Sequence, residues 1–259
     1  MSSVSIHRYA ETACRGAKPT MAGLLADKSS LGLAAGVAHY VATAAEHRVP
    51  VFIGEGNSIS CGGYAGVSDA WGAALWVVDA LFAMAAVGIQ RWNFHGMPGG
   101  PYAVFDFPSE AAEDAQVRPI FYGLLGFARA VGGGRAVQRK VRALASTNPL
   151  IKCWAVSTPG GGARVVLIHK DAAASGDATV TITPAGQPSA TGSLVRGLPG
   201  AEGVDSKWDS AISLAGLSWA TTLNGVPAGQ EVSEPVQVVG GKYQVRLPPA
   251  SFAVLDLPA

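Results

Sequence analysis

The sequence has 259 residues, of which 49% are hydrophobic and only 14% carry a charge. This composition allows a sizeable core, in one large domain or two smaller ones, and it excludes a disordered chain. The formal net charge of +1 argues against nucleic acid as the main partner.

The first half of the chain repeats the order strand then helix three times. Continuous or alternating apolar runs predict the strands, and apolar residues at helical spacing predict the helices. The predicted units are 4–9 with helices at 21–25 and 31–45, 51–54 with a helix at 69–87, and 89–94 with a helix at 117–131. Such consecutive units predict a parallel sheet, in which the carboxyl ends of the strands share one edge.

Glu55 directly follows the apolar strand at 51–54 and lies between Gly54 and Gly56, which break any helix. We therefore expect Glu55 at the carboxyl end of a strand. In a (β/α)8 barrel that end carries the chemistry, whereas the opposite end serves stability. A glutamate in this position also caps a loop or forms an ion pair in many proteins, so its position alone does not assign it a function.

The helix at 69–87 is almost continuously apolar and approaches the length of a membrane span. Asp79 lies at its middle, and no Lys or Arg lies close to either end, both of which argue against a span. Ser68 is a candidate N-cap for a helix inside a folded domain. We therefore predict a helix buried on several sides, with the barrel strands on one side and the C-terminal domain on the other.

The pattern changes to short β segments after Gly132-Gly133-Gly134. This tract lacks the preceding strand and the following Lys-Ser/Thr of a phosphate loop, so we interpret it as a linker between a domain at 1–134 and a domain at 135–259. The predicted strands are 151–157, 163–169, 179–183, 192–198, 217–223, 235–239, 243–247 and 252–257. Their spacing predicts an antiparallel β-sandwich.

A basic cluster opens this second domain and comprises Arg135, Arg139, Lys140 and Arg142. One interpretation is a patch for sulfated glycans. The other is the solvated face of an edge strand, where basic residues discourage pairing with other chains. The alternation of these residues with valines favours the edge strand.

Three cysteines leave at least one thiol unpaired within the chain. Cys153 lies in an apolar run and is predicted to be a buried thiol. Cys14 and Cys61 each follow a predicted strand, in loops at the same end of the sheet. Whether these two pair stays open, and a disulfide between them would indicate an oxidising compartment.

Other catalytic schemes have weaker support in the sequence. Ser58 and Ser60 lack the Gly-x-Ser-x-Gly elbow, and the five histidines show no zinc-motif spacing. His7 and His95 could join Glu55 as metal ligands, but a histidine beside a sugar site more often takes part in hydrogen bonds. We therefore expect no metal and no cofactor.

The stretch from Gly54 to Gly63, Gly-Glu-Gly-Asn-Ser-Ile-Ser-Cys-Gly-Gly, with Gly66-Val67-Ser68-Asp69 after it, resembles glycoside hydrolase family 79. That family includes β-glucuronidases and heparanase. Further matches occur in the family's order at His7-Arg8-Tyr9, Asn93-Phe94-His95-Gly96 and Phe121-Tyr122-Gly123-Leu124-Leu125. The resemblance covers residues 3 to about 135 and continues only as a β-rich tail of the expected length.

The resemblance implies that the three strand–helix units are the last three of a (β/α)8 barrel, with strands one to five absent from this sequence, followed by an antiparallel β-sandwich. It also implies that Glu55 is the nucleophile of a retaining glycosidase. Such an enzyme needs a second carboxylate about 5 to 5.5 Å away as acid/base. By resemblance that glutamate would precede Met1, and Glu11, which matches no family motif, is a poor substitute.

The expected partners of Glu55 come from neighbouring strand ends and are His7, Tyr9, Asn57 and His95. In uronate-cleaving relatives, glycine N–H groups and two tyrosines also hold the carboxylate of the sugar. Gly62 and Tyr102 match two of these positions, whereas Ser60 stands in place of the first tyrosine and Cys61 in place of a glycine found in some relatives. We expect a β-linked uronic acid as substrate, with a neutral hexoside as the alternative.

Two hypotheses of different classes stay open. The chain is either the C-terminal part of a retaining β-glucuronidase-like hydrolase or a non-catalytic carbohydrate-binding or interaction protein derived from one. In both, the missing barrel half or another chain must cover the open sheet edge. The resemblance implies an extracellular or secretory location, although no signal peptide opens the sequence.

Overall fold

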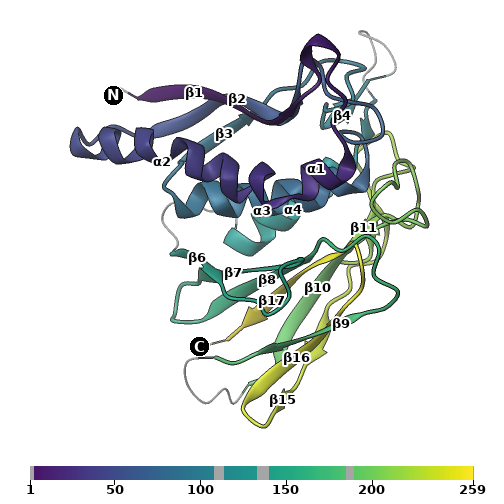
Figure 1. Cartoon of the computed structure of the whole chain (residues 1–259). Coiled ribbons are helices and arrows are strands. Elements are labelled where there is room, and N and C mark those ends of the chain that lie inside the picture. The colour runs from purple at the N-terminus through teal and green to yellow at the C-terminus, as the bar shows by residue number, and fades with distance from the viewer. Residues whose placement is uncertain (1–2, 108–113, 133–139, 185–189, 259) are drawn as a thin grey trace.

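The computed structural model describes residues 3–107, 114–132, 140–184 and 190–258. Its N-terminal part holds a three-stranded parallel sheet in the order β1 (Val4–Thr12), β2 (Val51–Ser60) and β3 (Arg91–Phe94). Helices pack against one face of this sheet, between it and the C-terminal sheets (Figure 1). They are α1 (Met21–Leu25), α2 (Leu31–Glu46), α3 (Trp71–Ala86) and α4 (Ile120–Val131), with 3-10 turns at Cys14–Gly16 and Asp27–Ser29. The predicted parallel strands and their helices are thus confirmed.

The expectation that Glu55 marks the end of its strand is wrong. Strand β2 continues to Ser60, because its residues from Glu55 onward pair with β1 from His7 onward after a shift in register. The flanking glycines serve close packing instead of ending the strand: a Cβ on Gly56 would collide with the carbonyl oxygen of Arg8. Gly56 is paired with the last residue of β3, so Glu55 still lies at the carboxyl end of that neighbouring strand.

Helix α3 is buried along almost its whole length, as predicted. The fully buried Asp79 forms an ion pair with Lys170 of the C-terminal part and accepts a hydrogen bond of 2.7 Å from Trp154 Nε1. The predicted N-cap at Ser68 is wrong. The N–H groups of Trp71 and Gly72 instead donate to backbone carbonyls at 204 and 206, contributed by the C-terminal part. No helix among the described residues is both long and apolar enough to cross a membrane.

The C-terminal part contains two antiparallel sheets that pack face to face across a core of their own (Figure 1). The larger sheet has the order β13-β12-β11-β10-β17-β8-β7-β6, with β14 also paired to β10, and the smaller has the order β15-β16-β9. The bounds are β6 Val141–Leu144, β7 Ile151–Ser157, β8 Ala163–His169, β9 Ala178–Ile182, β10 Gly192–Leu198, β11 Ser213–Leu214, β12 Leu217–Ser218, β13 Ala228–Gly229, β14 Glu234–Val236, β15 Val238–Val239, β16 Lys242–Leu247 and β17 Phe252–Leu257. A separate pair, β4 (Phe105–Asp106) and β5 (Gln116–Val117), lies between β3 and α4.

Most of the predicted strands of this part occur as expected. The strand predicted at 235–239 is instead two strands, β14 in the larger sheet and β15 in the smaller. The strand predicted at 217–223 is also wrong. The observed strand ends at Ser218. The N–H of Trp219 donates to the hydroxyl of Tyr122 on α4, so it is not available for a hydrogen bond to a neighbouring strand. The predicted linker and domain boundary near 134, together with Arg135 and Arg139, lie outside the described residues. Lys140 and Arg142 are exposed at β6, the outermost strand of the larger sheet, as predicted for an edge.

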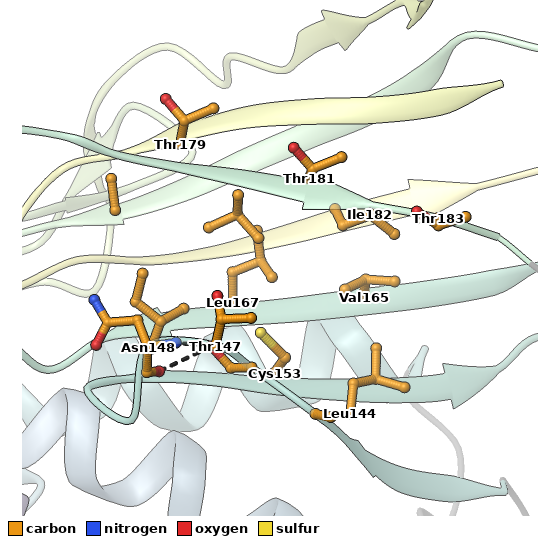
Figure 2. A pocket seen from close by; sticks show the side chains of 15 residues that line it. Leu144, Thr147, Asn148, Cys153, Val165, Leu167, Thr179, Thr181, Ile182 and Thr183 are labelled. Atoms are coloured by element: carbon orange, nitrogen blue, oxygen red, sulfur yellow. Dashed lines mark hydrogen bonds between the residues drawn. The ribbon is translucent and has the colours of Figure 1, made fainter. Parts of the chain in front are cut away.

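A pocket of about 660 Å³ opens between the two sheets, beside the outer strand β9 (Figure 2). Val165 and Leu167 of β8 lie on one side of it, and Thr179 and Thr181 of β9 lie on the other. Cys153 also lines this pocket and is half-buried, less so than predicted. Burial raises the pKa of its thiol to about 11, so the thiol stays protonated at neutral pH.

Candidate active site

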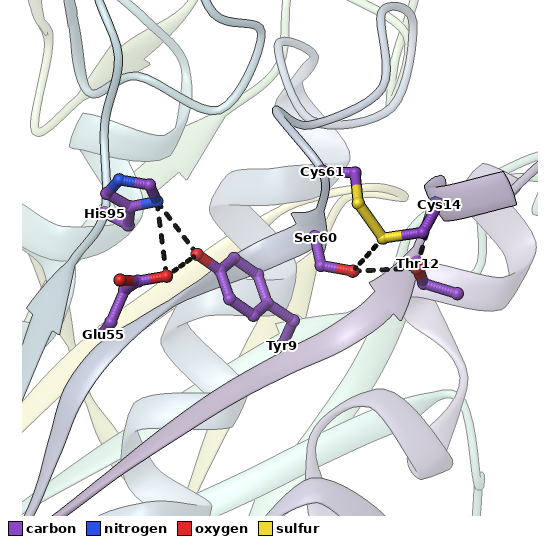
Figure 3. The surroundings of a disulfide bond; sticks show 7 residues. All are labelled: Tyr9, Thr12, Cys14, Glu55, Ser60, Cys61 and His95. Carbon is purple, nitrogen blue, oxygen red and sulfur yellow. Dashed lines mark hydrogen bonds and ion pairs between the residues drawn. A yellow bond between two sulfur atoms is a disulfide. The ribbon is translucent and has the colours of Figure 1, made fainter.

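The carboxylate of Glu55 on β2 is held by side chains from the two neighbouring strands, β1 and the end of β3. Tyr9 on β1 donates a hydrogen bond of 2.7 Å from its hydroxyl to Glu55 Oε1. Nδ1 of His7 lies 3.7 Å from Glu55 Oε2, and Nδ1 of His95 lies 3.6 Å from Oε1. Figure 3 shows Tyr9 and His95 converging on one side of this carboxylate. The side chain of Glu55 keeps 35% of its surface exposed, so it is both held and accessible.

His95, which directly follows β3, lies between two tyrosine hydroxyls. Its Nδ1 is 2.9 Å from the hydroxyl oxygen of Tyr9 and 3.0 Å from that of Tyr102. The single hydroxyl proton of Tyr9 is used in the bond to Glu55, so Tyr9 can only accept a bond from His95. Nδ1 of His95 donates to Tyr9 in the tautomer that carries a proton on this atom, and it accepts a hydrogen bond from the Tyr102 hydroxyl in the other tautomer.

The electrostatics of this group favour an ionised carboxylate. The hydrogen bond from Tyr9 holds the pKa of Glu55 below its ordinary value, and the nearby His95 and His7 act in the same direction. Burial raises the pKa of Tyr9 above its ordinary value, and its bond to Glu55 adds to this. Burial likewise raises the pKa of Tyr102, as does the charge of Glu55. Glu55 is thus anionic at neutral pH and both phenols are protonated.

Asn57 positions the loop that carries two of these residues. Its side chain is fully buried, and its Nδ2 donates to the carbonyl oxygens of His95 (2.7 Å) and Tyr102 (2.8 Å). Its Oδ1 accepts a hydrogen bond from the N–H of Ser58. The expected contact of Asn57 with a sugar stays a prediction. The contacts that the structure shows fix the backbone on which His95 and Tyr102 stand.

Cys14 and Cys61 form a disulfide that links the ends of β1 and β2, with a Cα–Cα distance of 5.4 Å. The hydroxyl of Ser60 donates to Thr12 Oγ1 at 2.8 Å and lies 3.5 Å from Cys14 Sγ. Figure 3 shows this side chain turned toward Thr12 and the disulfide, away from Glu55. Gly62 follows with a φ of 95°, which favours glycine.

Glu11, the other carboxylate considered from the sequence, is engaged elsewhere. Its Oε1 forms an ion pair of 2.8 Å with Lys28 and accepts a hydrogen bond from the hydroxyl of Ser29. These contacts tie β1 to the 3-10 turn at Asp27–Ser29. Among the described residues, no group of three or more His, Cys, Asp or Glu side chains is arranged to hold a metal ion.

Two residues near the site escaped the sequence reasoning. Thr12 accepts the bond from Ser60, and its position at the end of β1 became visible only with the full length of that strand. Trp92 on β3 places a buried Nε1 close to Gly56, and this atom has no partner among the described residues. The sequence around Trp92, between Arg91 and Asn93, carried no signal for this proximity.

An ionised and partly exposed carboxylate held by a phenol at strand ends can act as a nucleophile or as a general base. No protein-family model matches the sequence, and no protein of curated function matches it. Among solved structures, the chain is similar to a 4-O-α-L-rhamnosyl-β-D-glucuronidase from Fusarium oxysporum 12S, with a TM-score of 0.81 and 23% identity over 98% of this chain and 53% of that one.

The chain has a glycoside hydrolase fold. It is also similar to the GH51 arabinofuranosidase from Xanthomonas axonopodis pv. citri, with a TM-score of 0.68 and 15% identity over 99% of this chain and 53% of that one. A third similar structure is CelM2, a bifunctional glucanase-xylanase from a metagenome library, with a TM-score of 0.58 and 16% identity over 99% of this chain and 44% of that one. The chain thus spans about half the length of the glycoside hydrolases it matches.

Proposed function

We propose that this chain supplies the nucleophile of a retaining glycoside hydrolase of β-glucuronidase type. In this proposal residues 1–134 are the last three βα units of a (β/α)8 barrel, and residues 135–259 form the β-sandwich that follows it. The observation that carries the proposal is the constellation around Glu55: an ionised, accessible carboxylate at the carboxyl edge of parallel strands, oriented by Tyr9 and flanked by two histidines. Chemistry resides at this edge of such barrels.

In the proposed mechanism Glu55 attacks the anomeric carbon of the sugar and forms a covalent glycosyl-enzyme, which water then hydrolyses. The Tyr9 hydroxyl holds one carboxylate oxygen and leaves Oε2 for the attack. A second carboxyl group must protonate the leaving group and later activate water, about 5 to 5.5 Å from Glu55. Since Glu11 is paired with Lys28, we propose that this acid/base comes from the part of the barrel beyond these residues.

The surface beside β3 supports the idea that further strands complete the barrel. Strands β1 and β3 are the outer strands of the described parallel sheet. Next to β3 lies an open apolar groove of about 660 Å³ between the loop after this strand and α4. Met97, Phe105 and Phe107 expose 49%, 43% and 41% of their surface there. Apolar patches of this kind mark surfaces that another part of a protein covers.

A uronic acid is the proposed sugar. Cys61, Gly62 and Gly63 have positive φ values of 63°, 95° and 87°, and successive N–H groups in such turns form anion-binding nests. Tyr102 packs against Gly63 of this turn, and its hydroxyl contacts His95. A neutral hexoside is the second candidate, because the hydroxyl of Ser60 is bonded to Thr12 instead of being free to bind a sugar carboxylate.

The disulfide also bears on where the protein folds. Disulfides persist in oxidising compartments and are rare in the reducing cytosol. The bond between Cys14 and Cys61 therefore supports a secretory or extracellular location. This part of the proposal does not depend on the substrate.

A covalent trap tests the proposed nucleophile. We expect 2-deoxy-2-fluoro-β-D-glucuronyl fluoride to label Glu55, because fluoride departs without protonation and the trap does not need the acid/base residue. Mass spectrometry of peptides from the chain, alone and with a complementary barrel half, would locate the label. The glucosyl analogue in parallel compares the two candidate sugars.

The variant Glu55→Gln should lose all labelling, whereas Glu11→Gln, which removes a carboxylate paired with Lys28, should retain it. Labelling at another residue would assign the nucleophile elsewhere. If the protein with a complete barrel resists both fluorides, the proposal of a retaining hydrolase fails and the non-catalytic alternative gains support. Faster labelling by the glucosyl fluoride would assign the neutral sugar.

A further inference from the structure

A second concave site lies in the loop between β10 and β11. The cavity holds about 320 Å³, a size at the lower end of small-molecule sites. Its lining combines an aromatic ring, an ammonium group, a hydroxyl and two carboxylates, from Ala201, Glu202, Ser206, Lys207, Trp208 and Asp209. Trp208 exposes 37% of its surface, so its indole ring is accessible from solvent.

Two chains of contacts connect this cavity to the loops around Glu55. On one side, Lys207 Nζ lies 3.1 Å from Asp69 Oδ2, and Asp69 Oδ1 accepts the N–H of Gly66 in the loop after β2. This is the loop that begins with Cys61 and Gly62. Lys207 is thus connected through Asp69 to Gly66, which lies three positions beyond Gly63 of the turn that the proposed function assigns to sugar binding.

On the other side, the guanidinium of Arg118 lies 5.0 Å from the centre of the Trp208 ring and donates to Asp106 at 2.7 Å. Asp106 in turn accepts the N–H of Gly99, in the loop that carries Tyr102. Figure 1 shows the loops beside β11 on the side of the molecule where β1 to β3 end. The cavity is thus connected to the loops of the proposed sugar site through intermediate side chains, without sharing residues with that site.

The chemistry of the lining favours a neutral sugar ring. A pyranose presents C–H groups on one face and hydroxyls at its rim, so it stacks on an indole while its hydroxyls bond to nearby polar groups. Around the cavity the carboxylates of Asp69, Asp106, Glu202 and Asp209 outnumber the cations of Arg118 and Lys207. This excess of negative charge disfavours a uronate or a sulfated sugar.

We propose that the Trp208 cavity is an accessory subsite that binds a neutral pyranose ring of a glycan whose cleaved uronosyl unit occupies the Glu55 site. The statement that the ligand is part of a uronosyl glycan rests on the proposed function. The cavity itself is a separate structural feature, because none of the residues that line it contacts Glu55. The glycan would then be a mixed one, with charged and neutral sugars.

Binding to the 259-residue protein tests the subsite without any turnover. The probes are methyl β-D-galactopyranoside, methyl α-L-rhamnopyranoside and methyl β-D-glucuronide, titrated to about 50 mM because single-ring contacts give millimolar dissociation constants. The readout is the indole N–H signal of Trp208 in two-dimensional NMR, assigned with Trp208→Tyr. We expect at least one neutral probe to shift this signal. The glucuronide should bind there about tenfold more weakly, because its carboxylate meets the excess of negative charge around the cavity.

Trp208→Ala should weaken neutral-sugar binding about tenfold, while Trp208→Tyr keeps an aromatic face and most of the affinity. Because both variants lack the indole signal of residue 208, their binding is followed through the backbone amide signals of residues 201–209. Glu55→Gln is the matched control and should leave the Trp208 titration unchanged. Failure of every neutral probe to shift the Trp208 signal would overturn the subsite, and equal or stronger binding of the glucuronide would overturn its preference for neutral sugars. Since no hydrolysis is measured, a protein without glycosidase activity could still show this binding, which separates the two proposals.

Discussion

At the residue scale, the hydroxyl of Tyr9 stabilises the ionised form of Glu55. It donates the shortest bond that the carboxylate receives from a described side chain and is the main cause of its lowered pKa. A carboxyl group whose pKa is lowered by folding contributes stability above its unfolded pKa, and this contribution is lost as the pH falls through the folded pKa. The bond therefore serves both the nucleophile and the fold at neutral and mildly acidic pH.

Tyr9→Phe removes this hydroxyl and keeps the ring. We expect the pKa of Glu55 to rise toward the ordinary value of about 4.3, because the anion loses its donor. Carbon-detected NMR titration of the glutamate carboxyl groups measures this directly. Tyr102→Phe, which removes a hydroxyl bonded to His95 and not to Glu55, is the control and should move the titration less. An unchanged Glu55 titration in Tyr9→Phe would show that the hydrogen bond is not the cause.

The sequence predicted the convergence of His7, Tyr9 and His95 on Glu55, since parallel strands bring their carboxyl ends together. It did not predict the buried position of Asn57 behind the loop after β3. From the sequence, an asparagine near a candidate nucleophile could equally well contact the substrate or form hydrogen bonds that hold a backbone segment in place. Only the path of the loop from 95 to 102 distinguishes the two.

At the scale of elements, α3 is anchored by a charge inside an apolar interface. Asp79 and Lys170 are 0% and 1% exposed at their side chains, and the hydroxyl of Ser30 and the indole of Trp154 also bond to the carboxylate. Buried ion pairs are weak net stabilisers, but each partner is costly to leave alone. The pair therefore fixes the register of α3 against the C-terminal sheet.

Asp79→Ala should lower the free energy of unfolding by about 3 to 5 kcal/mol, because Lys170 would remain buried without its partner. The double variant Asp79→Leu with Lys170→Met removes both charges and should recover much of this loss. Urea denaturation followed by tryptophan fluorescence measures both. Glu231→Ala is a matched control, since its pair with Arg129 is exposed and should be worth at most about 1 kcal/mol. A loss for Asp79→Ala no larger than the control would contradict this account.

Helices were predicted closely because their apolar period extends over many residues, whereas strand ends depended on single residues. Gly54 and Gly56 indicate either the end of a strand or a close approach by a neighbour. The choice depends on β1, whose backbone lies against Gly56. The end of β12 before Trp219 depended on the hydroxyl of Tyr122 on α4, and no local sequence pattern reveals that contact.

At the scale of the molecule, the disulfide closes a long loop around the N-terminal part. Cys14 and Cys61 are separated by 47 positions, which include α1, α2 and all of β2. By the chain-entropy estimate, removing a crosslink of this length costs about 4 kcal/mol. Cys14→Ala with Cys61→Ala should lower the free energy of unfolding by this order, as measured by guanidinium denaturation.

Cys153→Ala is the control, because this thiol is free and half-buried and should matter much less. Added reductant should bring the native protein toward the stability of the double variant. If the double variant matched the native protein, the disulfide would have no part in holding the ends of β1 and β2 together. The sequence left this pairing open, since it depends on how far β1 and β2 extend.

The way α3 is completed also determines the order in which the chain can fold during synthesis. The Nε1 of Trp71, at the first turn of this helix, donates to the carbonyl of Ala250, which the ribosome adds 179 positions later. At 5 to 20 residues per second this delay is roughly 10 to 35 s. Throughout that interval the sheet that covers this apolar helix is incomplete. We therefore expect nascent chains that stop short of Ala250 to bind a chaperone more strongly than the 259-residue chain does.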